Sequence, residues 1–149
     1  MKDAELQHHP EGGRFKEVFR SAREVTVNGR KRSALTHIYF ALQEGEYSRF
    51  HRVESDEIWN LYEGKRLLLH VFDPESIRLS THELSPAKRE YCFTVEAGLY
   101  QAAEPACGPV LAGCSVAPGF EFEDFTLLGE DSGEAELIRE MYPEMKRFL

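Results

Sequence analysis

The sequence predicts an all-β domain built as a barrel or a sandwich. Short segments rich in Val, Ile, Phe, Tyr and Thr recur from Phe15 to Leu128, and Gly, Pro, Asn or Asp separate them. This spacing is typical of a protein made of many short strands, and Asn28-Gly29 predicts a tight hairpin turn. The expected strands are residues 15–20, 24–27, 33–42, 49–53, 57–62, 66–72, 77–84, 91–95, 99–103, 110–116 and 120–127.

The C-terminal segment has a helical pattern instead. Ser132 is a suitable N-cap for a short helix over residues 133–141, where apolar side chains fall at helical spacing. Pro143 ends or kinks that helix. The 149-residue length fits one domain with its own core. We therefore expect a single domain over residues 1–149, comprising an N-terminal arm (1–14), a barrel (15–128) and a helical segment (131–149) on the outside of the barrel.

Composition argues against several classes of partner. The formal net charge of -8 and the pI near 5.3 disfavour attraction to nucleic acid or to anionic lipid. No apolar run approaches the ~20 residues that span a bilayer, and the N-terminus lacks the apolar core of a signal peptide. Cys92, Cys107 and Cys114 form an odd set without a close pair, so we expect reduced packing residues. A cytoplasmic location follows as an expectation.

One stretch has the residue spacing of a known metal-binding motif. The run GEYSRFHRVESDEIWNLYEG, from Gly45 to Gly64, resembles the first cupin motif position by position. In that motif two histidines and a glutamate point inward and hold a divalent metal. Here His51 and Glu57 occupy ligand positions, but Val53 stands where the motif has its second histidine. A hydrocarbon therefore replaces one ligand.

A second segment matches the second cupin motif in a similar, incomplete way. In EAGLYQ, residues 96–101, Gly98 is kept while Gln101 stands at the position of the ligand histidine. Only His51 and Glu57 remain as strong donors, and Gln101 offers a weak neutral oxygen. We therefore expect no tightly bound transition metal, with His51, Glu57 and Gln101 as weak candidate ligands, and no other cofactor.

Three longer runs extend the resemblance to a particular family. They are LQHHPEGGRFKEVFRS, SRFHRVESDEIWNLYEG and LAGCSVAPGFEFEDFTL, and together they resemble the cupin-5 family over about residues 6–128. That resemblance implies a double-stranded β-helix barrel, a homodimer, and a shape similar to that of deoxysugar-nucleotide epimerases. It does not imply one activity.

The motif resemblance also suggests a site inside the barrel. His51, Glu57 and Gln101 would face the interior together, with His51 as a general base and Glu57 as the carboxylate that orients it. The alternative is a buried hydrogen-bonded trio without a function, although burying three polar groups costs free energy unless each finds a partner.

Other side chains are candidate ligand contacts. Trp59 and Tyr39 could stack on a ring, and Arg49 could hold an acidic group. His70 shares a face with apolar neighbours and is either a core histidine or a cavity residue. For each of them, packing or a solvated surface is an equally good interpretation. We interpret the run HHPEGG, residues 8–13, as an arm with a tight turn that folds over a neighbouring subunit.

Three functions remain open at this point. The first is a metal-independent isomerase or epimerase acting on a carbohydrate or a similar small polar molecule, because SRFHR loosely resembles the histidine-bearing strand of the epimerases. The second is a non-catalytic barrel that binds or senses such a molecule. The third, a metal-dependent oxygenase or isomerase, is disfavoured by Val53 and Gln101.

Overall fold

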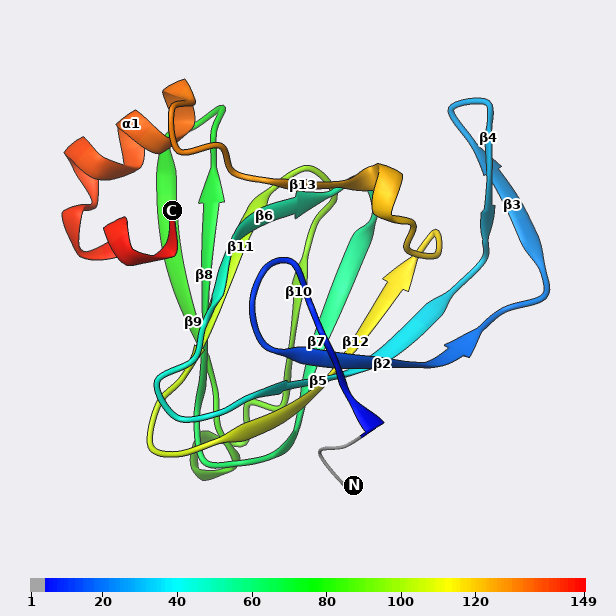
Figure 1. The fold of residues 1–149 in the computed structure, drawn as a ribbon, viewed down its shortest axis with the longest axis horizontal. Coiled ribbons are helices and arrows are strands. Elements are labelled where there is room, and N and C mark those ends of the chain that lie inside the picture. The colour runs from blue at the N-terminus through cyan, green and yellow to red at the C-terminus, as the bar shows by residue number, and fades with distance from the viewer. Residues whose placement is uncertain (1–4) are drawn as a thin grey trace.

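The computed structural model describes residues 5–149, which form two antiparallel sheets that face each other (Figure 1). The six-stranded sheet has the order β1 (Gln7–His8), β2 (Arg14–Arg20), β5 (Thr36–Leu42), β12 (Val110–Ala117), β7 (Asp56–Glu63) and β10 (Cys92–Val95). The five-stranded sheet has the order β13 (Phe125–Leu127), β6 (Ser48–Val53), β11 (Tyr100–Pro105), β8 (Leu67–Asp73) and β9 (Arg78–Leu84). This is the all-β jelly roll that the sequence predicts.

A separate hairpin projects from the barrel (Figure 1). It joins β3 (Glu24–Val27) to β4 (Arg30–Ser33) through Asn28 and Gly29, whose φ angles of 51° and 75° confirm the predicted tight turn. The single strand expected over residues 33–42 is wrong, because β4 ends at Ser33 and β5 begins at Thr36. Between the two strands, Ala34 N donates to Arg23 O at 2.8 Å, which prolongs the pairing of the hairpin by one residue before β5 begins.

The last predicted strand is also interrupted. Residues Phe122–Asp124 form a 3-10 turn, and only the three residues of β13 pair with β6. The turn brings the buried carboxylate of Asp124 to Arg32, whose Nε lies 2.6 Å from Asp124 Oδ2. A buried carboxylate needs such a partner, so this ion pair overrides the alternating pattern of the segment.

The main core lies between the sheets. Alternate residues of β8, namely Leu67, Leu69 and Val71, point into it and are almost fully buried. Phe40 and Trp59 meet edge to face from the opposite sheet, with ring centroids 5.5 Å apart. Apolar side chains fill one part of the barrel, so any cavity must lie in the other part.

The C-terminal segment covers the outer face of the five-stranded sheet. Helix α1 (Gly133–Met141) starts at the predicted N-cap, where the Ser132 hydroxyl accepts a hydrogen bond from the Ala135 amide at 3.2 Å. The 3-10 segment Pro143–Phe148 follows and buries Phe148 against Phe50. Within residues 5–149, neither the length nor the apolar character of any helix is sufficient for crossing a membrane.

The N-terminal segment packs on its own barrel. β1 pairs with β2, and between them the His9 amide donates to Gly13 O at 3.1 Å, which closes the tight turn expected here. Gly12 has a φ of 110°, and a Cβ there would collide with the carbonyl oxygen of Tyr47. The turn therefore requires glycine and carries its preceding residues into the barrel. Residues 1–4 of the expected arm lie outside the described residues.

Candidate functional site

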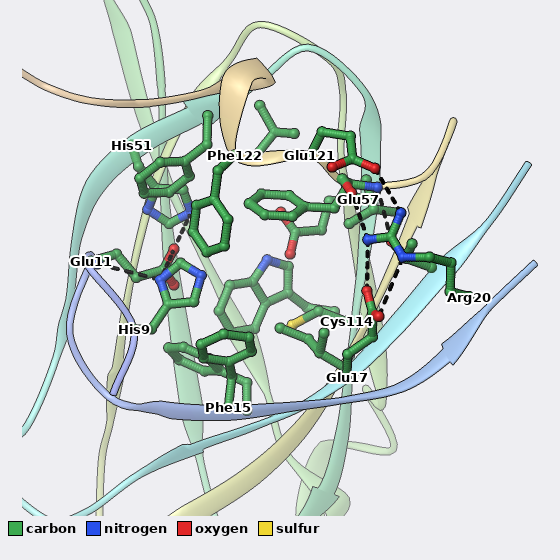
Figure 2. Close-up of a pocket in the computed structure, with 18 residues that line it drawn as sticks. His9, Glu11, Phe15, Glu17, Arg20, His51, Glu57, Cys114, Glu121 and Phe122 are labelled. Carbon is green, nitrogen blue, oxygen red and sulfur yellow. Dashed lines mark hydrogen bonds and ion pairs between the residues drawn. The ribbon is translucent and has the colours of Figure 1, made fainter. Parts of the chain in front are cut away.

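A cavity of about 270 Å³ lies between the sheets, where β2, β5, β7 and β12 face β6 (Figure 2). Its walls are mainly aromatic, formed by Phe15, Phe40, Trp59, Phe120, Phe122 and Phe125. Its His, Glu and Arg side chains fall into two groups. His9, Glu11, His51 and Glu57 are buried in the interior, whereas Glu17, Arg20 and Glu121 form a partly exposed rim. We call these groups the interior cluster and the rim.

His51 is held in one orientation by its own strand. Its Nδ1 lies 2.7 Å from the carbonyl oxygen of Arg49, so Nδ1 carries the proton and donates it, and Nε2 is left as an acceptor. Nε2 lies 3.1 Å from Glu11 Oε2. Burial lowers the pKa of His51 to about 4. The imidazole is therefore neutral at pH 7.

Glu11 supplies the missing proton to this contact. Burial, together with the charge of Glu57, raises the pKa of Glu11 well above 4.5. Its Oε1 accepts a hydrogen bond from the Ser48 hydroxyl at 2.9 Å, so its Oε2 is left to donate to His51 Nε2. Glu11 and His51 are thus a neutral acid and a neutral base that share one hydrogen bond.

His9 completes this corner of the cavity without adding charge. Its Nδ1 accepts the Glu11 backbone amide at 3.3 Å and lies 3.3 Å from Glu11 Oε2. Burial lowers the pKa of His9 to about 4, so the ring is neutral. Its ring also packs edge to face on Phe15, with centroids 4.8 Å apart.

Glu57 belongs to a second hydrogen-bonded chain. Its Oε2 accepts from Gln101 Nε2 at 2.7 Å, and Gln101 Oε1 accepts from Trp59 Nε1 at 2.7 Å. Burial raises the pKa of Glu57 to about 7, although the bonds from Gln101 and from the Cys114 thiol act in the opposite direction. At neutral pH this carboxyl group is close to half ionised, which suits a group that exchanges protons.

The structure brings most of the motif residues together, with one change of partner. His51, Glu57 and Trp59 line the cavity, while Gln101 lies behind Glu57 and Trp59 and bonds to both. The expectation that Glu57 orients His51 is wrong, because the carboxyl group that contacts His51 is Glu11. Glu57 is oriented by the amide of Gln101 instead.

Three other candidate contacts do not line the cavity. Tyr39 lies on the outer face of β5 and packs edge to face on Tyr62, since Ile38 and Phe40 on either side of it point inward. The Arg49 side chain approaches Glu130, 3.9 Å away. His70 lies under the C-terminal segment, where its ring is 5.0 Å from that of Phe148. The alternation of side chains along a strand predicts which residues lie on the same face of the sheet. It does not predict which of the two faces meets the second sheet.

Sequence reasoning missed His9 and Glu11. The composition of HHPEGG indicates only an arm with a turn, and nothing in its spacing relates it to a strand of the barrel. The available signal was the pair Gly12-Gly13, because two consecutive glycines with positive φ let the backbone turn sharply against another strand. Here Glu11, the residue before the two glycines, is buried and lines the cavity.

The donor set does not fit a transition metal. Both amide atoms of Gln101 are bonded to protein groups, both ring nitrogens of His51 face protein oxygens, and Val53 presents only methyl groups to the cavity. Across residues 5–149, no group of three or more His, Cys, Asp and Glu side chains is arranged to hold a metal ion. Among the described residues, the lining therefore combines acids, bases and rings without the donor set of a metal site.

Comparisons with known proteins agree with the fold and give the family. A protein from Shewanella oneidensis is 33% identical, with a TM-score of 0.79, and the match covers 97% of this chain and 89% of that one. A hypothetical protein from Leishmania major is 31% identical, with a TM-score of 0.77, and the match covers 96% and 90% of the two chains. The capsular polysaccharide assembling protein CapF from Staphylococcus aureus shares the fold at 10% identity and a TM-score of 0.64, and the match covers 83% of this chain and 33% of CapF.

A search of curated proteins finds no match. The profile of one family, described as Cupin superfamily (DUF985), matches residues 1–128. This match covers both motif segments and most of the strands that enclose the cavity. The chain therefore belongs to the Cupin_5 family of the cupin superfamily.

Proposed function

We propose that this cupin binds a small organic molecule containing one ring inside its barrel. The observation that carries the proposal is the cavity of about 270 Å³ between the sheets, with six aromatic side chains in its walls. A cavity of about 150 Å³ in another protein holds one benzene molecule, so this space suits a ligand of roughly a dozen non-hydrogen atoms.

The lining narrows the chemical class further. Apolar walls favour a ligand with an apolar body, and the interior cluster offers it a few hydrogen bonds at one end. A sugar nucleotide suits this space poorly, because its diphosphate needs several free cations. Arg20 is the only Lys or Arg among the lining residues, and two glutamates already bond to it. A compact ring is thus a better ligand than a large polar metabolite.

Trp59 gives a direct test. It is the only tryptophan of the chain, it is 1% exposed, and it lines the cavity. Titration with a library of ring compounds should therefore change its fluorescence when one of them enters. Val53→Phe should abolish this change by filling the cavity, whereas Val18→Phe, at an exposed position outside the cavity, should preserve it. Equal responses in the two folded variants would refute binding inside the barrel.

A second candidate function is metal-independent proton transfer on the bound molecule. The observation that favours it is the contrast between two buried carboxyl groups, since Glu11 holds its proton firmly while Glu57 has a pKa of about 7. Ionised Glu57 can remove a proton from one carbon of a ligand and return it to another, and the Glu11 hydroxyl can turn from His51 Nε2 to donate its hydrogen bond to the ligand oxygen that gains charge. The product is an isomer of the substrate.

Exchange of ligand hydrogens with solvent deuterium tests this second function. For a ligand found by titration, the protein should catalyse exchange at a carbon next to a carbonyl group, and the rate should rise with pH through about 7 as Glu57 ionises. Glu57→Gln should stop the exchange while the Trp59 titration still detects ligand. Exchange that persists in this variant would exclude Glu57 as the base.

A further inference from the structure

The rim contains a charged arrangement that a purely neutral ligand would not need. Arg20 Nη2 lies 2.7 Å from Glu17 Oε1, and Arg20 Nη1 lies 2.8 Å from Glu121 Oε1 (Figure 2). Arg20 also donates from Nε to Glu17 at 3.3 Å and from Nη2 to the carbonyl oxygen of Phe120 at 3.0 Å. All three guanidinium nitrogens are therefore engaged, and the rim has one positive and two negative charges.

This arrangement disfavours ligands with negative charge. A carboxylate or phosphate is normally held by the free fork of an arginine, and here that fork is already occupied by two carboxylates. An incoming anion would have to displace one glutamate and then remain beside it. The negative charges of the anion and of the neighbouring glutamate would then repel each other, particularly next to apolar walls.

The interior lacks a positive partner for its own carboxylate. Glu57 is 6% exposed and accepts a hydrogen bond from a neutral amide. Among the lining residues, Arg20 is the only Lys or Arg, and it is bonded to the rim glutamates. The raised pKa of Glu57, caused by burial, agrees with a buried carboxylate that has no counter-ion among these residues.

The aromatic walls also favour a positively charged ligand. The faces of aromatic rings carry partial negative charge and attract organic cations. Phe40, Trp59 and Phe125 line the same cavity as Glu57. A positive group in this space would thus lie among aromatic side chains and near a carboxyl group.

We propose that the cavity selects an organic cation, namely a ring compound carrying a protonated or quaternary amine, and that the Glu17–Arg20–Glu121 rim rejects carboxylates and phosphates. The positive group lies between the aromatic walls and Glu57, and the apolar ring fills the remaining space. This inference rests on the proposed binding inside the barrel and names the charge of the ligand.

Three probes of nearly equal shape test it. Cyclohexylmethylamine, cyclohexylmethanol and cyclohexanecarboxylate share one ring and differ in charge, and their rings do not absorb where tryptophan is excited. Titrations followed by Trp59 fluorescence at neutral pH should give binding of the amine at least about tenfold tighter than that of the alcohol, with the carboxylate weakest.

Variants locate the source of the selectivity. Glu57→Gln should weaken binding of the amine more than binding of the alcohol, and the double variant Glu17→Gln and Glu121→Gln should raise the affinity for the carboxylate. Glu123→Gln is the matched control, because Glu123 is exposed, does not line the cavity and pairs with Arg32. It should leave the order of the three probes unchanged.

The possible outcomes separate the two proposals. If none of the probes and no compound of the ring library binds, binding inside the barrel is wrong and the inference on charge is wrong with it. If all three probes bind with equal affinity, or if the carboxylate binds best, binding stands and the inference on charge is overturned. The inference on charge is also overturned if the amine keeps its full advantage in both Glu57→Gln and the rim double variant.

Discussion

Two histidines of the five-stranded sheet pair with glutamates, one on each face of that sheet. His51 Nε2 is 3.1 Å from Glu11 Oε2 on the inner face, and His70 Nε2 is 3.1 Å from Glu104 Oε1 on the outer face. Both histidines are buried, and burial lowers the pKa of both. Distance and burial therefore do not distinguish the two pairs.

Their surroundings do distinguish them. Beside His70, Thr81 Oγ1 bonds to Nδ1 at 2.9 Å, and the cation Arg147 pairs with Glu104. Phe148 covers the ring. No Lys or Arg among the described residues pairs with Glu11 in the same way, and both members of the inner pair line an open cavity. Free space beside a neutral pair thus identifies a candidate site better than the pair itself.

The largest expected effect concerns Phe148, whose ring covers the outer histidine–glutamate pair. Phe148 is 1% exposed, so Phe148→Ala should lower the free energy of unfolding by about 3–5 kcal/mol. Phe125 lies beside His51 with ring centroids 5.4 Å apart and is only partly buried, so Phe125→Ala should cost less stability but weaken ligand binding. Urea denaturation and Trp59 titration measure the two effects. The comparison fails if Phe148→Ala impairs binding in the folded protein as much as Phe125→Ala does.

The next effect concerns pH and the inner face. The folded protein keeps the proton of Glu57 up to about pH 7, whereas an exposed glutamate loses it near 4.5, so this group makes the protein less stable as the pH rises between these values. Glu57→Gln removes this loss. Relative to the parent, the free energy of unfolding of Glu57→Gln should therefore rise by up to about 3 kcal/mol between pH 4.5 and about pH 7.

Asp124→Asn is the matched control for this prediction. Asp124 is also buried, but Arg32 lowers its pKa below 3.8, so its contribution is already complete above that pH and is lost only as the pH falls. Thermal denaturation at a series of pH values should therefore show no comparable rise for Asp124→Asn. Parallel curves for Glu57→Gln and the parent would show that Glu57 titrates normally.

A smaller effect is expected from removal of each histidine. His51→Ala and His70→Ala should each cost about 1–3 kcal/mol of stability, because each leaves a buried glutamate with one hydrogen bond fewer. Only His51→Ala should impair binding to the cavity. Unfolding of His51→Ala alone would instead mark the inner pair as chiefly structural.

The smallest effect concerns Arg147, which pairs with Glu104 of the outer pair. Arg147 is 53% exposed on its side chain, so Arg147→Gln should change the free energy of unfolding by less than about 1 kcal/mol. Because the charge of Arg147 lowers the pKa of His70, the variant should raise that pKa, which NMR titration can measure. An unchanged pKa would show that the cation does not act on the pair.

More of the fold than of the candidate site could be predicted from the sequence. Short apolar segments, the Asn28-Gly29 turn and the Ser132 cap are local signals, and they predicted the strands, the hairpin and the helix. The strand over residues 120–127 was wrong because Asp124 bonds to Arg32, 92 residues away in sequence. Local alternation contains no information about such a partner.

The site was predicted only where a motif covers it. The two motifs led to His51, Glu57 and Gln101, because their spacing places these residues on strands that face the interior. They did not lead to Glu11, which reaches the cavity from a turn. Tyr39 and His70 were misplaced as cavity candidates for a different reason, since alternation groups residues by face without showing which face meets the second sheet.

The N-terminal turn has a consequence for how this barrel can change over time. Glu11 and His9 come from a loop of a few residues at the edge of the six-stranded sheet, whereas the strand ladder that encloses the cavity lies elsewhere in the chain. Exchanging that loop would alter the acid presented to a ligand and leave the ladder intact. The loop that carries Glu11 is therefore separable from the strands that carry His51 and Glu57, so grafting one short segment is a way to change part of the polar lining of the cavity.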